Sequence, residues 1–300
     1  MKCGIIDVGS NTIRLSIYHW EGKRFKLLMN KKEMAGLAGY IHKGVLSDEG
    51  VQVACQVLGS LKALTDNLEI REVRAFATAS LRNIINTGEA VEAIHTATGL
   101  DVEVLSGTDE ASYSFLGATV GGGAPETGLL ADIGGGSTEL VAYRDGEIVS
   151  ECSLPIGSLS LYTKYVGGLL PTRTERRAMR DRVLEELDRA RTAGISCAHL
   201  TGVGGTIRAA GKLCAAASGD ARDLSAEEIR ALYKELKKGD LDTMHQLLRV
   251  VPDRVHTILP GLTILKAVIE RYGIESVTVS GYGVREGYLL DRVMGVKGHG

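Results

Sequence analysis

The chain has 300 residues, of which 44% are hydrophobic and 24% are charged, and it contains 38 glycines. This composition is typical of a globular protein, and the length predicts about two domains. The net charge of −2 provides no overall positive field, so we expect no nucleic-acid partner.

The sequence carries no pattern of secretion or membrane insertion. Polar Asp7 follows the start too soon for a signal peptide, and no apolar stretch reaches the ~18 residues of a membrane span. The five cysteines are scattered, without the spacing of metal ligands. We therefore expect a cytoplasmic protein with reduced thiols and no membrane segment.

The first elements form a strand–turn–strand unit. A buried strand over residues 5–8 turns at Gly9-Ser10-Asn11, and alternating apolar residues resume at Ile13. Glu21-Gly22 is typical of a hairpin turn before a strand over 25–28. The elements expected next are a helix capped by Ser47, a strand over 74–77, a helix from Asn86 to Gly99, a strand over 102–105 and a helix carrying Asp109 and Glu110.

The middle of the chain repeats the opening order. A strand ends at Asp132, a Gly-Gly-Gly-Ser-Thr turn follows, and strands over 139–143 and 148–154 are joined by the hairpin signal Asp145-Gly146. Asp7 and Asp132 thus head two similar segments about 125 residues apart, which indicates a duplicated α/β half. Residues 121–125 are the best linker candidate between the halves.

Strands and helices alternate in the rest of the chain, which predicts crossover units and parallel or mixed sheets. The expected elements are a helix from Thr172 or Thr174 to 193–194, a strand over 199–203 that ends at Gly204-Gly205-Thr206, a helix over 207–217, a helix with the capping box Ser225–Glu228, an amphipathic helix over 262–271, a strand over 277–280 and a final helix over 285–293.

The stretch from Asp132 to Thr138 has the features of a phosphate site. Consecutive glycines allow backbone amides to point together into a concavity that accepts an oxyanion, and Ser137 and Thr138 add hydroxyl donors. An acid such as Asp132 beside bound phosphate implies a cation between them, and Mg²⁺ is the expected one. Taken alone, the stretch is equally compatible with a glycine-rich turn at the end of a buried strand.

Six motifs together resemble the exopolyphosphatase and guanosine pentaphosphate phosphohydrolase family. They are residues 7–15, 77–83, 106–111, 132–140, 204–206 and 280–287, in family order across nearly the whole chain. The resemblance implies the duplicated fold of actin, sugar kinases and the Hsp70 ATPase, which is ribonuclease H-like. It also implies two domains flanking a cleft, and we place them at residues 1–120 plus 284–300 and at residues 121–283.

The resemblance places the catalytic acid on Glu110 and the phosphate-loop acid on Asp132. The implied reaction is hydrolysis of the terminal phosphoanhydride of inorganic polyphosphate, which releases orthophosphate, with Asp7 and Asp132 as Mg²⁺ ligands. Residues and resemblance together predict phosphate contacts from Gly9, Ser10, Asn11, Thr12, Arg14, Arg82, Gly134, Gly135, Gly136, Ser137, Thr138, Gly204, Gly205 and Thr206.

Two features depart from the family pattern. Asp109-Glu110 stands where a pair of glutamates is frequent, and the chain stops at residue 300 without the helical domain of longer members. We therefore expect the short, two-domain form, for which a homodimer is an open option. An acid in the first turn of a helix is also favoured by the helix dipole alone, which is the alternative reading of Glu110.

Other functions stay open at this level. Within the class, the substrate is either polyphosphate or a (p)ppGpp-type nucleotide, with removal of the 5′-phosphate of pppGpp. Outside it, an ATP-dependent small-molecule kinase or a non-catalytic, actin-like scaffold shares the fold. The arginines of residues 173–182 suggest a polyanion track, but interleaved acids make a solvated helix face the better reading.

Overall fold

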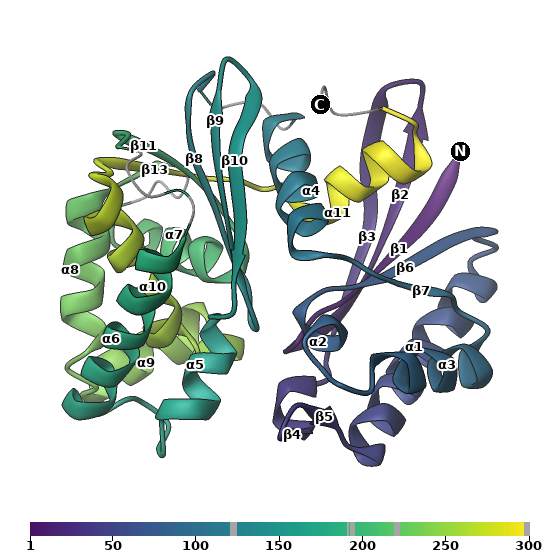
Figure 1. Ribbon diagram of the computed structural model, residues 1–300, viewed down its shortest axis with the longest axis horizontal. Helices are drawn as coiled ribbons and strands as arrows, with labels where there is room; N and C mark the ends of the chain where they lie inside the picture. Colours follow the sequence, from purple (N-terminus) through teal and green to yellow (C-terminus); the bar gives the residue numbers. More distant parts are fainter. Residues whose placement is uncertain (121–124, 191, 193–195, 219–222, 297–300) are drawn as a thin grey trace. The chain divides into compact units, whose positions relative to one another are not determined.

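The computed structural model describes residues 1–120, 125–190, 192, 196–218 and 223–296 (Figure 1). The chain divides into two compact units. Unit 1 holds residues 1–110 and a C-terminal segment that begins at Leu289, and unit 2 holds residues 111–288. The first crossing falls within helix α4 (Gly107–Val120), ahead of the boundary expected at residue 120. The linker expected over 121–125 lies, apart from Pro125, outside the described residues.

Unit 1 is built on a sheet with the strand order β3-β2-β1-β6-β7. Strands β1, β2 and β3 form an antiparallel meander, and β6 and β7 continue the sheet in parallel with β1. The bounds are β1 (Lys2–Val8), β2 (Thr12–Glu21), β3 (Arg24–Met34), β6 (Glu72–Ala77) and β7 (Val102–Val104), with a separate hairpin of β4 (Ile41–His42) and β5 (Val45–Leu46).

The helices of unit 1 begin and end largely where capping residues predict. Ser47 caps α1 by accepting a hydrogen bond from the Gly50 amide, and Gly99 ends α3 in the left-handed conformation. Asn86 differs from the prediction, because its side-chain amide pairs with the backbone N–H and C=O of Leu46 and gives α3 no side-chain cap. The bounds are η1 (Leu37–Tyr40), α1 (Asp48–Asn67), α2 (Ala79–Arg82) and α3 (Thr87–Thr98).

Unit 2 repeats the sheet of unit 1. Its strand order is β10-β9-β8-β11-β13-β12, with an antiparallel meander of β8, β9 and β10 followed by β11 and β13 in parallel with β8. The antiparallel strand β12 at the edge has no counterpart in unit 1. The bounds are β8 (Gly128–Ile133), β9 (Thr138–Arg144), β10 (Glu147–Leu154), β11 (His199–Val203), β12 (Asp223–Ser225) and β13 (Ser276–Val279).

Helix α10 (Ile258–Tyr272) lies at the centre of the helical layer of unit 2, where it packs against α5, α6, α7 and α8. Only Lys266, Glu270 and Arg271 are not buried in it, so the helix is apolar on nearly all sides rather than amphipathic as predicted. The other helices are α5 (Ser158–Tyr165), α6 (Arg173–Arg189), α7 (Gly205–Ser218), α8 (Ala226–Leu236), α9 (Leu241–Val250), η2 (Pro252–Arg254), α11 (Val284–Tyr288) and the π-helical turn η3 (Leu289–Val293) of unit 1.

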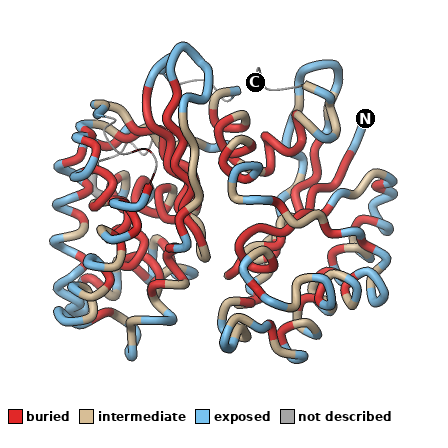
Figure 2. Tube along the Cα trace, viewed as in Figure 1, coloured by how far each residue is buried: buried red, intermediate tan, exposed pale blue. Residues whose placement is uncertain are grey.

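The shared strand pattern confirms the predicted duplicated α/β fold of the actin-like class. Figure 2 shows buried residues along the central strands of each sheet, and every residue of β8 is buried. Ser225 caps α8 through the capping box expected from the sequence, and Thr172, one of the two expected starts, caps α6 through a capping box of its own. Within the described residues, none of the helices has the length and apolar character needed to cross a bilayer.

Candidate functional site

The glycine turn of unit 1, residues 9–12, here called loop 1, joins β1 to β2. The Gly9 amide donates to the Thr12 carbonyl at 3.0 Å and closes the turn. The Ser10 carbonyl accepts from the Ala38 amide at 3.0 Å, and this peptide bond is trans. Because C=O and the following N–H point in opposite directions in a trans peptide, the Asn11 amide faces away from η1.

The corresponding turn of unit 2, residues 134–138, here called loop 2, has the same closure. The Gly134 amide donates to the Ser137 carbonyl at 3.0 Å. The carbonyl of Gly134 accepts from Ser158, and that of Gly135 accepts from two further amides of the first turn of α5, each at 2.9 Å. The amides of Gly135 and Gly136 therefore point away from α5, as an oxyanion site requires.

Loop 2 rests directly on Gly157, the residue before α5. A Cβ at Gly157 would lie 2.4 Å from the carbonyl carbon and oxygen of Gly135 and 2.6 Å from the Gly136 nitrogen. The Thr138 hydroxyl donates to the Ile156 carbonyl at 2.7 Å, so it ties loop 2 to the segment that precedes α5. The glycine at position 157 thus permits a backbone contact that fixes loop 2.

A third glycine turn, Gly204-Gly205-Thr206, here called loop 3, leads from β11 into α7. Gly204 has a φ of +94°, a conformation that favours glycine. The guanidinium of Arg254, the last residue of η2, packs against the Cα of Gly205, since a Cβ at Gly205 would collide with it. A helix N-terminus beside a guanidinium is suited to bind an anion. The hydroxyl of Thr206, in the first turn of this helix, is buried and has no hydrogen-bond partner within the described residues.

Asp132 ends β8 and is buried, with 8% of its surface exposed. Burial raises the pKa of its carboxyl above the ordinary value, and the charges of Arg208 and Arg285 oppose this shift. Ser114 opposes it as well, because its hydroxyl donates to Asp132 Oδ2 at 2.6 Å. Burial also lowers the pKa of Arg208, with repulsion from Arg285 as the second cause.

The two acids at the start of α4 have different surroundings. Asp109 accepts from the backbone amide and the hydroxyl of Ser106, at 3.2 and 2.6 Å, and the Ser106 hydroxyl accepts from the Asp109 amide. Asp109 therefore stabilises the helix start. Glu110 is buried, with 7% exposed, and its Oε2 accepts from Arg82 Nη1 at 2.6 Å. The capping explanation thus applies to Asp109 rather than to Glu110.

The cross-strand partners of the loop acids differ between the units. Asp7 faces Arg14 across β1 and β2, whereas Asp132 faces Glu139 across β8 and β9. Directly opposite residues of an antiparallel pair extend to the same side of the sheet. Glu139 is buried, and its Oε1 accepts from the Ser153 hydroxyl at 2.7 Å. Unit 1 therefore pairs its acid with a cation, and unit 2 pairs its acid with a second acid.

The donor set of unit 2 fits a magnesium ion that takes further ligands from water and phosphate. No group of three or more His, Cys, Asp or Glu that could hold a metal occurs among the described residues. Mg²⁺ in phosphoryl-transfer sites is commonly held by one or two carboxylates besides phosphate oxygens. A Cβ at Gly204 would lie 2.6 Å from Asp132 Oδ1, so glycine permits the loop 3 backbone to pack closely against this oxygen.

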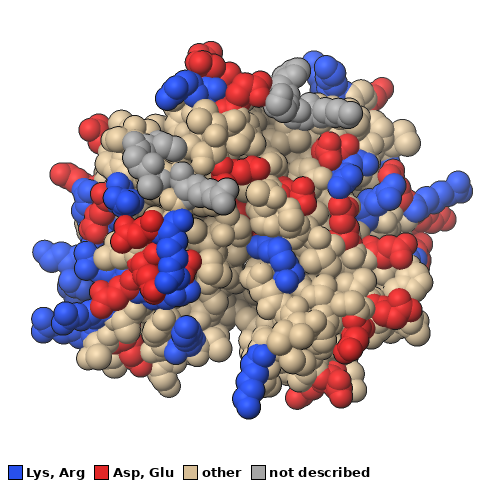
Figure 3. All heavy atoms as spheres, in the orientation of Figure 1, with Lys and Arg blue, Asp and Glu red and all other residues tan. Residues whose placement is uncertain are grey.

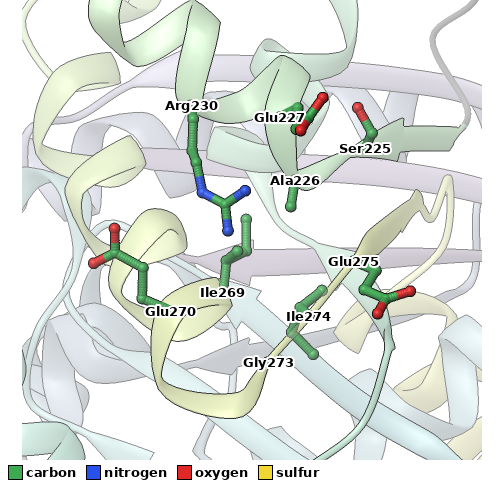
Figure 4. A pocket seen from close by; sticks show the side chains of 9 residues that line it. All are labelled: Ser225, Ala226, Glu227, Arg230, Ile269, Glu270, Gly273, Ile274 and Glu275. Atoms are coloured by element: carbon green, nitrogen blue, oxygen red, sulfur yellow. The ribbon is translucent and has the colours of Figure 1, made fainter.

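Two other features of unit 2 lie apart from the predicted site residues. A pocket of about 590 Å³ lies between the start of α8 and the end of α10, with Arg230 above Ile269 (Figure 4), and it contains none of those residues. On α6, Arg182 and Arg189 form ion pairs with Glu185 and Glu186. Basic and acidic side chains are intermixed over the helical side of the unit (Figure 3), as expected of a solvated face.

The structure brings the predicted residues together within each unit. Arg82 meets Glu110 in unit 1, and loop 3 meets Asp132 in unit 2 through Gly204. The residues that sequence reasoning missed are Ser114, Glu139, Arg208, Arg254 and Arg285. Of these, only Glu139 could have been inferred from the sequence. It lies seven residues after Asp132, just as Arg14 lies seven residues after Asp7 in the repeated segment.

Comparisons with known proteins identify the fold and the family of the chain. An exopolyphosphatase from Cytophaga hutchinsonii superposes with a TM-score of 0.86 at 25% identity over 99% of both chains. The Aquifex aeolicus member of the Ppx/GppA family superposes with a TM-score of 0.78 at 26% identity over 98% of both chains. Nucleoside triphosphate hydrolases from Neospora caninum, at 12% identity and a TM-score of 0.55, share the fold over 98% of this chain and 92% of theirs. The model of the Ppx/GppA phosphatase family matches residues 16–295, and the chain therefore belongs to this family and is a phosphoanhydride hydrolase.

Proposed function

We propose that this protein is an exopolyphosphatase, which hydrolyses the terminal phosphoanhydride of inorganic polyphosphate and releases orthophosphate. The observation that carries the proposal is the buried carboxylate of Glu110, held at 2.6 Å by Arg82 while Asp109 stabilises the helix start. The likeness to the exopolyphosphatase from Cytophaga hutchinsonii over 99% of both chains supports this choice of substrate.

Glu110 is proposed to orient the attacking water and to accept its proton. The new bond forms between the water oxygen and the terminal phosphorus as the bridging P–O bond breaks, and the shortened chain leaves as an anion. A group that accepts a proton must hold a fixed position, and the hydrogen bond from Arg82 provides it. Arg82 thus acts on the carboxylate as well as being a candidate for the phosphate contact predicted from sequence.

The backbone amides of the loops are proposed to bind phosphoryl oxygens. The backbone amides of Asn11 in loop 1 and of Gly135 and Gly136 in loop 2 face away from the segment that binds the carbonyl of the preceding residue. Fixed donors of this kind stabilise charge on an oxyanion without reorganising during the reaction. Loop 3, with Arg254 beside Gly205, is proposed as a further phosphate or nucleotide contact.

Asp132 is the proposed principal ligand of Mg²⁺, with Asp7 as the second candidate. When bound, the ion neutralises charge on phosphate oxygens and polarises the phosphoryl group. Asp132 is placed first because its cross-strand partner is the acid Glu139, whereas that of Asp7 is the cation Arg14; the charges of Arg208 and Arg285 also act on Asp132.

The test is orthophosphate release by the purified protein with Mg²⁺, measured on polyphosphates of graded length beside pppGpp and ATP. Faster turnover of polyphosphate than of pppGpp supports the proposal. Preference for pppGpp would identify the nucleotide hydrolase instead. Transfer of phosphate from ATP to an added sugar or carboxylate, without polyphosphate hydrolysis, would identify a kinase.

Glu110→Gln tests the role of the acid. This variant keeps the size of the side chain but cannot accept a proton, so turnover should fall by about 10²- to 10⁴-fold. Asp109→Ala is the matched control on the same helical turn, because it removes only the hydrogen bonds with Ser106. Near-wild-type turnover of a folded Glu110→Gln protein would exclude the proposed role.

A further inference from the structure

Ser114 lies on α4, one helical turn after Glu110, and is completely buried. Its hydroxyl donates to Asp132 Oδ2 at 2.6 Å, a short bond of the kind formed between a hydroxyl and a carboxylate. Neither the glycine motifs nor the acid pair of the sequence indicates this serine. It is therefore a polar contact of the loop acid that comes from a distant part of the chain.

The two oxygens of Asp132 have different neighbours. Oδ2 accepts a hydrogen bond from the Ser114 hydroxyl. Gly283 is a second neighbour of Oδ2, since a Cβ at Gly283 would lie 4.0 Å from this oxygen. Oδ1 lies beside Gly204, where a Cβ would come within 2.6 Å. The backbone of Gly204 therefore packs closely against Oδ1, and the serine hydroxyl occupies the lone pair of Oδ2 that it faces.

We propose that Ser114 is a positioning residue that fixes the orientation in which the Asp132 carboxylate would hold a divalent cation. This inference rests on the proposed function, because it assigns a supporting partner to the proposed Mg²⁺ ligand. Hydrogen bonds to the far oxygen of a ligating carboxylate set its orientation, and their loss typically weakens metal binding or activity by about 10- to 100-fold.

Helix α4 is a rigid support for this hydrogen bond. A Cβ at Gly117 would lie 2.0 Å from the Gly283 carbonyl oxygen, and a Cβ at Gly287 would lie 1.9 Å from the Tyr113 carbonyl oxygen. The backbones of α4 and α11 are thus in direct contact on both sides of Ser114. Because the helix cannot shift easily against unit 2, the position of the Ser114 hydroxyl follows from the fold.

The chain offers a matched control two residues earlier. Ser112 lies on the same helix and donates to Glu151 Oε2 on β10 at 2.8 Å, which is also a serine–carboxylate bond. Ser112→Ala removes the same chemical group from the same helix without touching Asp132. Comparing Ser114→Ala with Ser112→Ala therefore separates the effect on the loop acid from the general loss of a helix hydroxyl.

The primary measurement is Mn²⁺ binding to the intact protein by isothermal titration calorimetry, because Mn²⁺ accepts the same carboxylate and water ligands as Mg²⁺. We expect Ser114→Ala to weaken binding by about tenfold or more, with Ser112→Ala at the wild-type value. The same ratio should appear in the Mg²⁺ concentration for half-maximal phosphate release, with the Michaelis constant for polyphosphate little changed.

Equal Mn²⁺ affinity of the two alanine variants would overturn the inference, as would a wild-type protein that binds no Mn²⁺. If Ser114→Ala fails to fold, Ser114→Cys decides, because it keeps the side-chain shape with a much weaker donor. Wild-type affinity in folded Ser114→Cys would also overturn the inference. Wild-type turnover of polyphosphate is a separate measurement, so failure of the proposed function is distinguishable from failure of the Ser114 role.

Discussion

Replacing Gly157 by alanine would drive a methyl group into the backbone of loop 2. The new Cβ would lie 2.4 Å from the carbonyl atoms of Gly135, whereas ordinary contacts of Cβ atoms begin at 3.4 Å. Loop 2 or the start of α5 must therefore move by about 1 Å, since backbone cannot rotate away as a long side chain can. Gly157 has a φ of −140° and a ψ of 171°, so alanine meets no dihedral strain there.

The displacement predicts two effects of Gly157→Ala. Overpacking of this kind typically costs about 1–3 kcal/mol in the free energy of unfolding. A misplacement of about 1 Å in groups that bind a reacting phosphate can cost about 10²-fold in rate, so the specificity constant should fall far more than stability suggests. Phosphate-release kinetics and urea unfolding of the same preparation would measure both quantities.

Gly168→Ala is the matched control for this prediction. It lies in the same unit, and its Cβ would meet the Leu170 carbonyl oxygen at 3.9 Å, which is an ordinary contact. Its kinetics and stability should stay near those of the wild type. If Gly157→Ala matched Gly168→Ala in both measurements, the argument that loop 2 is fixed by backbone contact with α5 would be refuted.

Three further predictions concern other parts of the chain. Gly117→Ala should lower the free energy of unfolding of unit 2 by about 1–3 kcal/mol or more, the usual cost of overpacking, because its Cβ would collide with the Gly283 carbonyl. Thermal unfolding measures this loss. Asp109→Ala should lower stability by about 0.5–2 kcal/mol through loss of the helix cap while leaving turnover near wild type. Burial raises the pKa of Cys3 to about 12 and that of Cys214 to about 11. The contribution of the two neutral thiols to the free energy of unfolding is therefore complete below about pH 9 and is lost as the pH rises through 11 and 12. Urea unfolding between pH 8 and 11 should show this decline, and the double variant Cys3→Ala/Cys214→Ala should show a smaller one.

The fold was predictable because its signals are local and occur twice. The strand, acid and glycine turn at Asp7 and at Asp132 predict the same closure, and both turns close with a 3.0 Å bond across three residues. Helix α10 differs from the amphipathic prediction, because α5, α6, α7 and α8 pack around it and leave only Lys266, Glu270 and Arg271 unburied. Asn86 was misjudged because a distant backbone at Leu46 competes for its side chain.

The site was predictable only in part, since several of its contacts join elements that are remote in sequence. Glu110 and the loops stand in motifs, so a resemblance finds them. Ser114 and Arg254 lie outside the motifs, and Arg285 lies in one without having been singled out; each reaches the loops only when helices pack. The two adjacent acids at 109 and 110 show the same limit, because sequence cannot tell which carboxylate turns to the helix end and which is buried.

The duplication also explains why the two halves are suited to different ligands. Loop 1 and loop 2 share a closure and an outward amide, so both fit an oxyanion. Across the strands, however, unit 1 places Arg14 opposite Asp7, and unit 2 places Glu139 opposite Asp132. A carboxylate with a guanidinium on the same side of the sheet is compensated, whereas two carboxylates together favour a cation. One change of charge at a repeated position therefore distinguishes the two loop acids, and it is a ground for the proposal that Asp132 rather than Asp7 is the principal Mg²⁺ ligand.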